Sequence, residues 1–93
     1  MRQILIDCNQ ISSVKALHIY LQHVMDLPEY YGRNLDALHD VLTEIAQPTE
    51  LVLNASEPQL SDEMKGFVPR LVRVLKDAAQ ENPALILTGE RFS

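Results

Sequence analysis

The sequence predicts an α/β fold in which helices pack on a small three-stranded parallel sheet. Three short apolar runs stand apart from the rest of the chain, at residues 4–6, 51–53 and 85–87. Each run is continuous rather than alternating and too short for a helix, which is typical of strands covered on both faces or buried in parallel pairing. Segments with helical spacing separate the runs, and crossovers of this kind imply parallel strands with right-handed connections.

The segment between the first two runs contains two stretches with helical spacing. The first covers about residues 13–25 and can be capped by Ser12 or Ser13. Its apolar face is formed by Val14, Leu17, Leu21 and Val24. The second stretch covers about residues 34–46, carries an apolar stripe of its own, and is expected to end before Pro48.

The region between the second and third runs is expected to hold a short helical turn followed by a longer helix. The turn lies near residues 62–65, and the helix runs from about Phe67 to Asn82. Gly66 and Pro69 interrupt the helical pattern, but proline is tolerated in the first turn of a helix. Residues 89–93 are expected to form a frayed tail.

The length and the charge of the chain limit what it can do. The 93 residues leave room for one domain, so residues 1–93 are expected to share one hydrophobic core. The 46% of hydrophobic and 23% of charged residues are typical of a globular protein. The net charge of −5 would be repelled by nucleic acid phosphates and attracted by a basic protein. We therefore expect a protein partner and no direct binding of nucleic acid.

The cysteine content and the hydropathy pattern indicate a location. Cys8 is the single cysteine and cannot form an intramolecular disulfide, which fits a reducing cytosol. No segment approaches the roughly 18 apolar residues of a membrane span, and the first residues lead into a strand pattern without a signal peptide. We expect a cytoplasmic protein without membrane contact, and nothing in the sequence requires more than a monomer.

The residue types that enzymes use do not form a catalytic pattern here. His18 and His23 are five residues apart and face different sides of a helix, so they cannot form the i, i+4 pair of a zinc site. Cys8, at the end of the first strand, is best interpreted as a small buried thiol. The glycine-rich nucleotide-binding and nucleophile-elbow motifs are absent. The sequence predicts neither an enzyme nor a bound metal or cofactor.

Two acidic stripes distinguish the chain from an ordinary globular domain. Asp36, Asp40 and Glu44 recur at i, i+4 and i+8, with no Lys or Arg on the same row to pair with them. Asp77 and Glu81 form a second pair near the C-terminal end of the last helix, where the helix dipole disfavours negative charge. Each like-charged neighbour costs a helix about 0.2 to 0.5 kcal/mol. The stripes are either a solvated face that maintains solubility or a surface for a cationic partner.

The segment just before the second helical stretch, residues 28–34, reads Pro-Glu-Tyr-Tyr-Gly-Arg-Asn. Gly32 supplies a turn that a side chain would hinder, and Asn34 is suited to cap the following helix. Tyr30 and Tyr31 are two of the five aromatic residues of the chain and lie next to each other. They are either a loop plug packed on the core or anchors of a protein interface, where tyrosine is enriched.

This segment and the helix after it resemble the signature stretch of the barstar family of intracellular ribonuclease inhibitors. The matching residues are Leu-Pro-Glu-Tyr-Tyr-Gly at 27–32, Asn-Leu-Asp-Ala-Leu at 34–38, and Asp40. The resemblance extends more weakly along nearly the whole chain and implies a small parallel sheet with helices. It also implies inhibition without covalent chemistry. The loop and the second helix would plug the active-site cleft of a small, basic, barnase-like ribonuclease and so protect the cell that makes it.

The resemblance further implies which residues contact the ribonuclease. Asp40 would be the central anchor, with its carboxylate in place of an RNA phosphate among arginine and histidine side chains of the enzyme. Tyr30 and Tyr31 would pack over the cleft, and Asp77 aligns with a carboxylate position at the edge of the interface. The expected contact residues are Tyr30, Tyr31, Asn34, Leu35, Asp36, His39, Asp40, Glu44, Asp77 and Glu81.

Two residues depart from the family pattern. His39 stands where the inhibitor that names the family has a tryptophan, and its protonation would place a positive charge beside Asp40. Arg33 replaces an acidic residue and would repel a cationic enzyme, which slows association. These departures leave a second hypothesis open, in which a module of the same fold binds another basic protein without inhibiting a ribonuclease.

Overall fold

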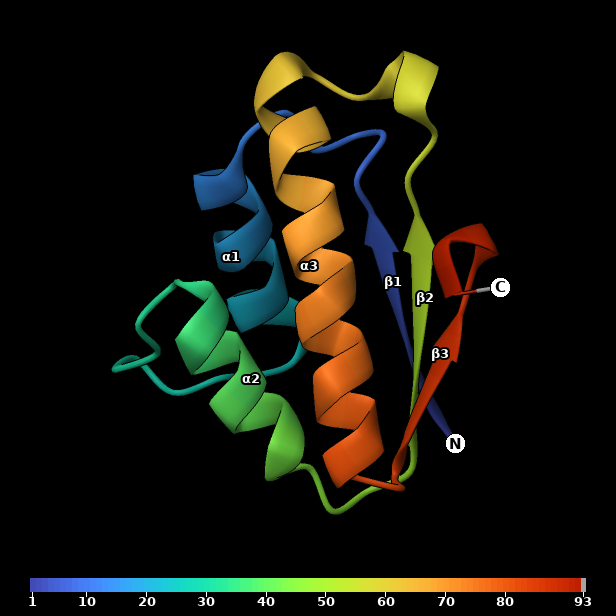
Figure 1. The fold of residues 1–93 in the computed structure, drawn as a ribbon. Helices are drawn as coiled ribbons and strands as arrows, with labels where there is room; N and C mark the ends of the chain where they lie inside the picture. The colour runs from blue at the N-terminus through green and yellow to red at the C-terminus, as the bar shows by residue number, and fades with distance from the viewer. Residues whose placement is uncertain (93) are drawn as a thin grey trace.

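The computed structural model describes residues 1–92 and has a three-stranded parallel sheet with strand order β1-β2-β3 (Figure 1). In chain order the elements are β1 (Arg2–Asp7), α1 (Val14–Val24), α2 (Leu35–Thr43), β2 (Thr49–Asn54), the 3₁₀ turn η1 (Glu57–Gln59), α3 (Asp62–Glu81), β3 (Leu85–Thr88) and the 3₁₀ turn η2 (Glu90–Phe92). The predicted α/β fold with a small parallel sheet is therefore confirmed. No helix among residues 1–92 has both the length and the apolar character of a membrane span.

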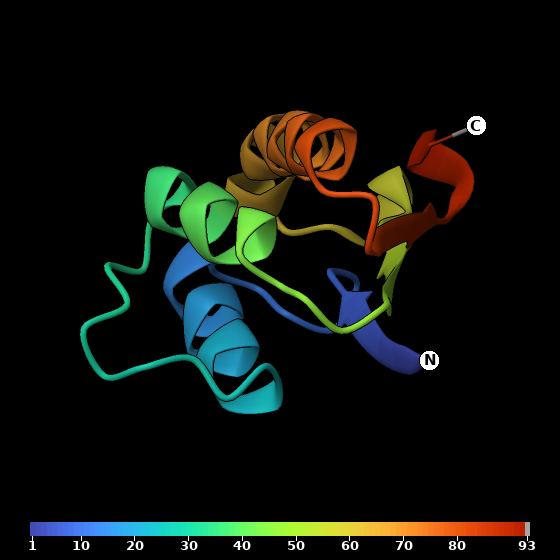
Figure 2. The same cartoon turned by 90° about the horizontal axis from the view of Figure 1, so that it is seen from below.

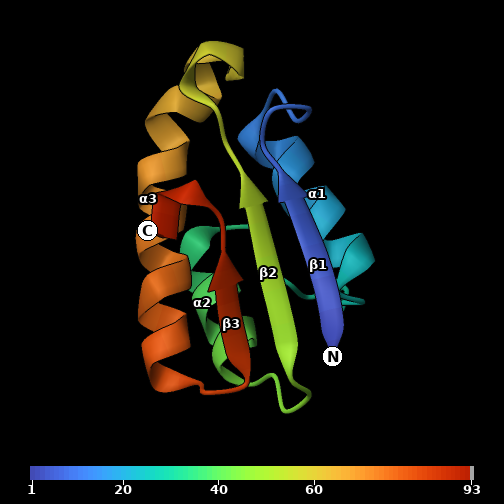
Figure 3. The same cartoon turned by 90° about the vertical axis from the view of Figure 1, so that its right-hand side faces the viewer.

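All three helices cover the same face of the sheet, as the views from below and from the side show (Figures 2 and 3). Burial consequently alternates along β1, where Ile4 and Ile6 are buried while Leu5 is 45% exposed. On β3, Ile86 is 44% exposed. The interpretation of these strands as covered on both faces is thus wrong. The alternation of buried and exposed positions could not be read from the sequence, because the exposed positions, such as Leu5 and Ile86, are apolar as well.

The first two helices begin at the capping residues that the sequence indicates. The Oγ of Ser13 accepts a hydrogen bond from the backbone N–H of Ala16, and the Oδ1 of Asn34 accepts one from Ala37. Each bond satisfies a backbone donor that the first turn of a helix leaves free. Val24, expected on the apolar face of the first helix, is instead 36% exposed at the last position of the helix.

The third helix is a single unbroken helix, which corrects the predicted turn and later helix start. It begins after Ser61, whose Oγ accepts a hydrogen bond from the N–H of Met64, and Pro69 lies inside it. Pro69 is exposed, whereas Phe67 and Val68 beside it are buried. Packing of this continuous apolar face offsets the hydrogen bond that proline cannot donate.

The C-terminal residues 89–92 are fixed against the sheet rather than frayed, and Ser93 lies outside the described residues. The Nε of Arg91 donates a hydrogen bond to the carbonyl of Ala55 at 3.2 Å. Gly89 has φ of +142°, and a Cβ there would lie 2.5 Å from the carbonyl oxygen of Leu53. Only glycine allows the chain to approach β2 this closely.

Candidate functional site

The exposed side of α2 carries the first acidic stripe, as its spacing predicts. Asp36, Asp40 and Glu44 are all exposed, and the side chain of Asp40 retains 83% of its accessible area. Among residues 1–92, no lysine or arginine lies within ion-pairing distance of these carboxylates, and His39 is the only basic side chain that comes so close. The stripe therefore presents negative charge that the described part of the chain leaves largely unneutralised.

His39 connects this stripe to the second one, on α3. Its Nε2 lies 2.9 Å from Oε2 of Glu81, and its Nδ1 lies 3.9 Å from Oδ1 of Asp40. Asp77 is also exposed, one helical turn before Glu81. α2 packs beside α3 (Figure 1), and the contacts of His39 bring together one carboxylate of each stripe, Asp40 and Glu81. We call the five carboxylates at 36, 40, 44, 77 and 81 the acidic surface.

A hollow of about 460 Å³ lies between α2 and the loop that precedes it. Its lining is mostly apolar, with Asp40 and Glu44 as its carboxylates. The other lining residues are Leu27, Pro28, Tyr30, Tyr31, Gly32, Ala37, Val41 and Ile45. A hollow with this lining suits a side chain that combines an apolar body with a positive end, such as arginine.

The two adjacent tyrosines lie in opposite environments. Tyr30 is 87% exposed, whereas Tyr31 is 5% exposed and belongs to the hydrophobic core. The hydroxyl of Tyr31 lies 2.7 Å from Nδ1 of the buried His18. The core-plug interpretation is therefore correct for Tyr31, and Tyr30 is the tyrosine that the free chain leaves exposed. Contact of Tyr31 with a partner stays a prediction.

Burial determines the ionisation of the His18–Tyr31 pair. It raises the pKa of Tyr31 to about 12 and lowers the pKa of His18 below that of a free histidine. The folded protein therefore holds both groups neutral at pH 7. This pair fastens the loop to α1.

The lowered pKa of His18 predicts a loss of stability in weak acid. Above the pKa that His18 has in the unfolded chain, its burial in the neutral form costs no stability. Below that pKa the unfolded chain binds a proton at His18 more readily than the folded protein does, so protonation favours unfolding. We expect the free energy of unfolding, measured with urea, to fall between about pH 8 and about pH 5.5. The fall should be smaller in His18→Gln than in wild type. Equal falls in both would contradict this assignment.

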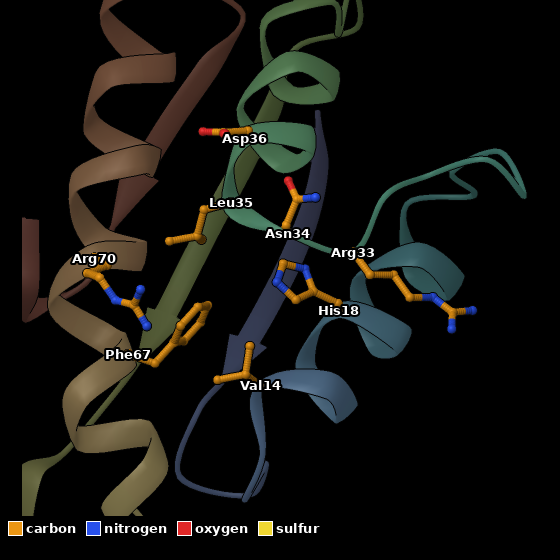
Figure 4. A pocket seen from close by; sticks show the side chains of 8 residues that line it. All are labelled: Val14, His18, Arg33, Asn34, Leu35, Asp36, Phe67 and Arg70. Carbon is orange, nitrogen blue, oxygen red and sulfur yellow. The ribbon is translucent and has the colours of Figure 1, made fainter.

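A second hollow, of about 410 Å³, lies at the N-terminal end of α2 (Figure 4). Asn34, Leu35 and Asp36 line it from α2, and Arg70 lines it from α3 with its guanidinium 5.7 Å from the Phe67 ring centroid. Asn34 is fixed by the hydrogen bond of its cap and Leu35 by packing against the core, while the side chain of Asp36 is exposed. Three of the expected contact residues consequently lie at the edge of one hollow.

Arg33 takes the left-handed backbone conformation in the loop, with φ of 52°. Its Nε donates a hydrogen bond to Oε1 of Gln22 on α1, so the side chain extends away from the hollow (Figure 4). At Gly32 the sequence predicted a turn that a side chain would hinder. There a Cβ would lie 3.2 Å from Nδ2 of Asn34, so a side chain is hindered by crowding rather than by φ.

Asn82 is a residue of the site that sequence reasoning missed. Its buried side-chain Nδ2 donates hydrogen bonds to the carbonyls of Leu42 and Ile45, at 2.9 and 2.8 Å, and its Oδ1 accepts one from the N–H of Ala84. The amide thereby satisfies carbonyls at the C-terminal end of α2. The asparagine before Pro83 indicated the end of a helix, but nothing in the sequence indicated which carbonyls it binds.

Cys8 is buried, as predicted. Burial, with a smaller effect of Asp7, raises the pKa of its thiol to about 11, so the reactive thiolate is scarce at pH 7. Among residues 1–92, no group of three or more His, Cys, Asp or Glu residues is placed to hold a metal ion. The arrangement of exposed carboxylates beside an apolar hollow is suited to binding a cationic surface.

The comparisons with known proteins agree with this description. Residues 1–89 match the family model described as "Barstar (barnase inhibitor)". A Bacillus subtilis (strain 168) protein named "Putative ribonuclease inhibitor YrdF" is 39% identical over 83 residues, which cover 87% of this chain and 89% of the relative. With a match over nearly its whole length and the parallel sheet described above, this chain belongs to the barstar family.

Proposed function

We propose that this protein is a cytoplasmic inhibitor of a small, basic ribonuclease. Membership of the barstar family and the name of the Bacillus subtilis relative support a role of the ribonuclease-inhibitor type. The position of Asp40 supports the more specific proposal that the target is a small, basic ribonuclease. Its carboxylate is 83% exposed, is central to the acidic surface and lies at the edge of the hollow of about 460 Å³.

In the proposed complex, α2 and the preceding loop cover the active-site cleft of the ribonuclease. Arginine binds carboxylate and phosphate oxygens with the same forked geometry, so the Asp40 carboxylate takes the place of an RNA phosphate. The exposed ring of Tyr30 packs on the wall of the cleft. Positive charge from the enzyme relieves the repulsion among the carboxylates of α2. Inhibition then needs no covalent step.

The remaining contact residues surround this centre. Asn34, Leu35 and Asp36 lie at the N-terminal end of α2, and Asp77 and Glu81 lie on α3. We propose that the α2 group extends the contact along the cleft and that the α3 pair meets basic residues at its edge. Rigid placement of these groups reduces the ordering cost of binding.

Electrostatic steering should make association fast and dependent on salt. The chain has a net charge of −5 and presents its acidic surface to the enzyme. We expect the association rate constant with a basic ribonuclease to fall at least about tenfold between about 0.05 M and about 0.5 M NaCl. Stopped-flow measurements of tryptophan fluorescence of the enzyme would show this, since the chain itself has no Trp. A rate independent of salt would contradict steering.

The function itself is tested by capture followed by assay. Tagged wild-type protein and Asp40→Ala serve as paired baits for the secreted proteins of the producing organism, and the captured protein is assayed on RNA with and without added inhibitor. The proposal expects a basic ribonuclease that the wild-type bait retains, that the variant bait retains poorly, and that wild-type protein inhibits. Capture of a basic protein without nuclease activity would support the alternative, a barstar-fold module for another partner.

A further inference from the structure

His39 lies between two carboxylates that the proposed function assigns to the ribonuclease contact. Its Nε2 is 2.9 Å from Glu81 and its Nδ1 is 3.9 Å from Asp40, and its own side chain is 32% exposed. The two ring nitrogens therefore face carboxylates on different helices. In the neutral ring, one nitrogen donates a hydrogen bond to Glu81, and the other carries no proton to offer Asp40.

The charged groups around His39 are predominantly acidic. On its own helix, Asp40 follows it and Asp36 lies three residues before it, on the same side of the helix. On α3, Glu81 contacts the ring and Asp77 lies one turn earlier. Arg33 of the loop binds Gln22 on α1 instead. Protonation of His39 would thus place one positive charge among several carboxylates that lack an arginine or lysine partner among residues 1–92.

We propose that His39 couples partner binding to proton release. The protonated imidazole is an internal cation that occupies Asp40 and Glu81, so it competes with the arginine or lysine side chains of a basic partner for the same carboxylates. The neutral imidazole leaves Asp40 free and keeps Glu81 in place through one hydrogen bond. Binding of a cationic partner therefore favours neutral His39 and expels its proton. This inference rests on the proposed function, because it concerns the same carboxylates.

The sign and the size of the effect follow from the geometry. Histidine is the side chain that changes charge between about pH 5 and pH 8, so the competing charge is present at the acidic end of that range. Affinity for the basic partner should fall as the pH is lowered. A unit charge at 3.9 Å from an exposed carboxylate predicts a loss of about fivefold to tenfold in affinity.

The test measures dissociation constants at about pH 8 and about pH 5.5 for three forms of the protein, with a barnase-type ribonuclease as the probe. His39→Gln keeps a donor that can reach Glu81 but has no charge to gain. His23→Gln is the matched control, because His23 is exposed near the end of α1. Titrating groups of the enzyme, and His18 of the inhibitor, act equally in all three forms and cancel in the comparison.

We expect wild type and His23→Gln to lose about five to ten times more affinity than His39→Gln over this pH interval. Calorimetry at about pH 6 in two buffers of different ionisation enthalpy should show additional proton release by the wild type over His39→Gln. Equal pH dependence in all three forms would overturn the proposal, provided that circular dichroism shows each form to be folded at the lower pH.

A measurement on the free protein separates this inference from the proposed function. If no ribonuclease binds, the proposed function fails, and the coupling of His39 to its carboxylates is then judged by NMR. The carboxyl carbon signals of Asp40 and Glu81 should follow the titration of the His39 ring in wild type and lose that inflection in His39→Gln. Carboxyl signals that ignore the His39 titration would overturn the proposed competition, whatever the partner.

Discussion

Replacing Asp40 by alanine is expected to weaken ribonuclease binding by at least about 2 kcal/mol, a loss of thirtyfold or more. The carboxylate is 83% exposed in the free chain and central to the acidic surface. In the proposed complex it would be desolvated against arginine side chains, and its removal would leave those charges buried without a partner. Isothermal titration with the captured ribonuclease, or with barnase as a probe, measures the loss.

The same substitution should leave the free energy of unfolding nearly unchanged, because the side chain packs on nothing in the core. The hydroxyl of Thr43 donates a hydrogen bond to the backbone carbonyl of Asp40, and alanine retains that carbonyl. Asp40→Asn keeps the shape of the side chain but removes its charge, and it should lose most of the affinity for the ribonuclease that Asp40→Ala loses. Glu57→Ala is the matched control, since it removes one exposed carboxylate from η1, at the far end of the molecule from α2 (Figure 1).

Comparison with the Glu57→Ala control distinguishes a local contact of Asp40 from a general effect of net charge. If Asp40→Ala and Glu57→Ala weaken binding equally, the acidic chain attracts the enzyme only through its net charge, and Asp40 is not an anchor. If only Asp40→Ala weakens binding, and its complex with the ribonuclease dissociates faster, the carboxylate is a local contact. An isotherm of Asp40→Ala that matches wild type would contradict the assignment outright.

The features that the sequence predicted correctly are those that local spacing controls. Asp36, Asp40 and Glu44 repeat with the helical period, so their common exposure could be predicted without knowing what α2 packs against. Ser13 and Asn34 cap the helices after them because a capping side chain binds the turn that follows it. The parallel order of the strands followed from the helices between them.

The features that could not be predicted depend on contacts between distant parts of the chain. Helical spacing gives the face of His39 but not that Glu81 lies opposite it, because the relative position of α2 and α3 is set by packing. Adjacent residues in a loop have no fixed period, so nothing local distinguishes the buried Tyr31 from the exposed Tyr30. Gly66 and Pro69 likewise suggested that the helix starts only near Phe67, and the burial of Met64 and Phe67, before and after Gly66, overrode that propensity.

Replacing Asn82 by alanine is expected to lower the free energy of unfolding by about 2 to 3 kcal/mol. The substitution removes both donors to the carbonyls of Leu42 and Ile45, and the acceptor for the N–H of Ala84. The site is 7% exposed, so water replaces these partners poorly and the groups are left unsatisfied. Urea unfolding monitored by circular dichroism measures the change.

Matched variants separate the hydrogen bonds of Asn82 from its volume and its position near the end of α3. Asn82→Asp keeps the size and the acceptor for Ala84 but turns a carboxylate oxygen toward two carbonyls, so it should destabilise at least as much as alanine. Gln80→Ala changes an exposed residue of the same helix and should remain within about 0.5 kcal/mol of wild type. If Asn82→Ala is as stable as Gln80→Ala, the amide does not hold α2. If Asn82→Ala is destabilised as expected, the protein that remains folded should also bind the ribonuclease more weakly. Asp40 lies in the last turn of α2 and Glu44 is its C-cap, and Asn82 fixes this end of the helix.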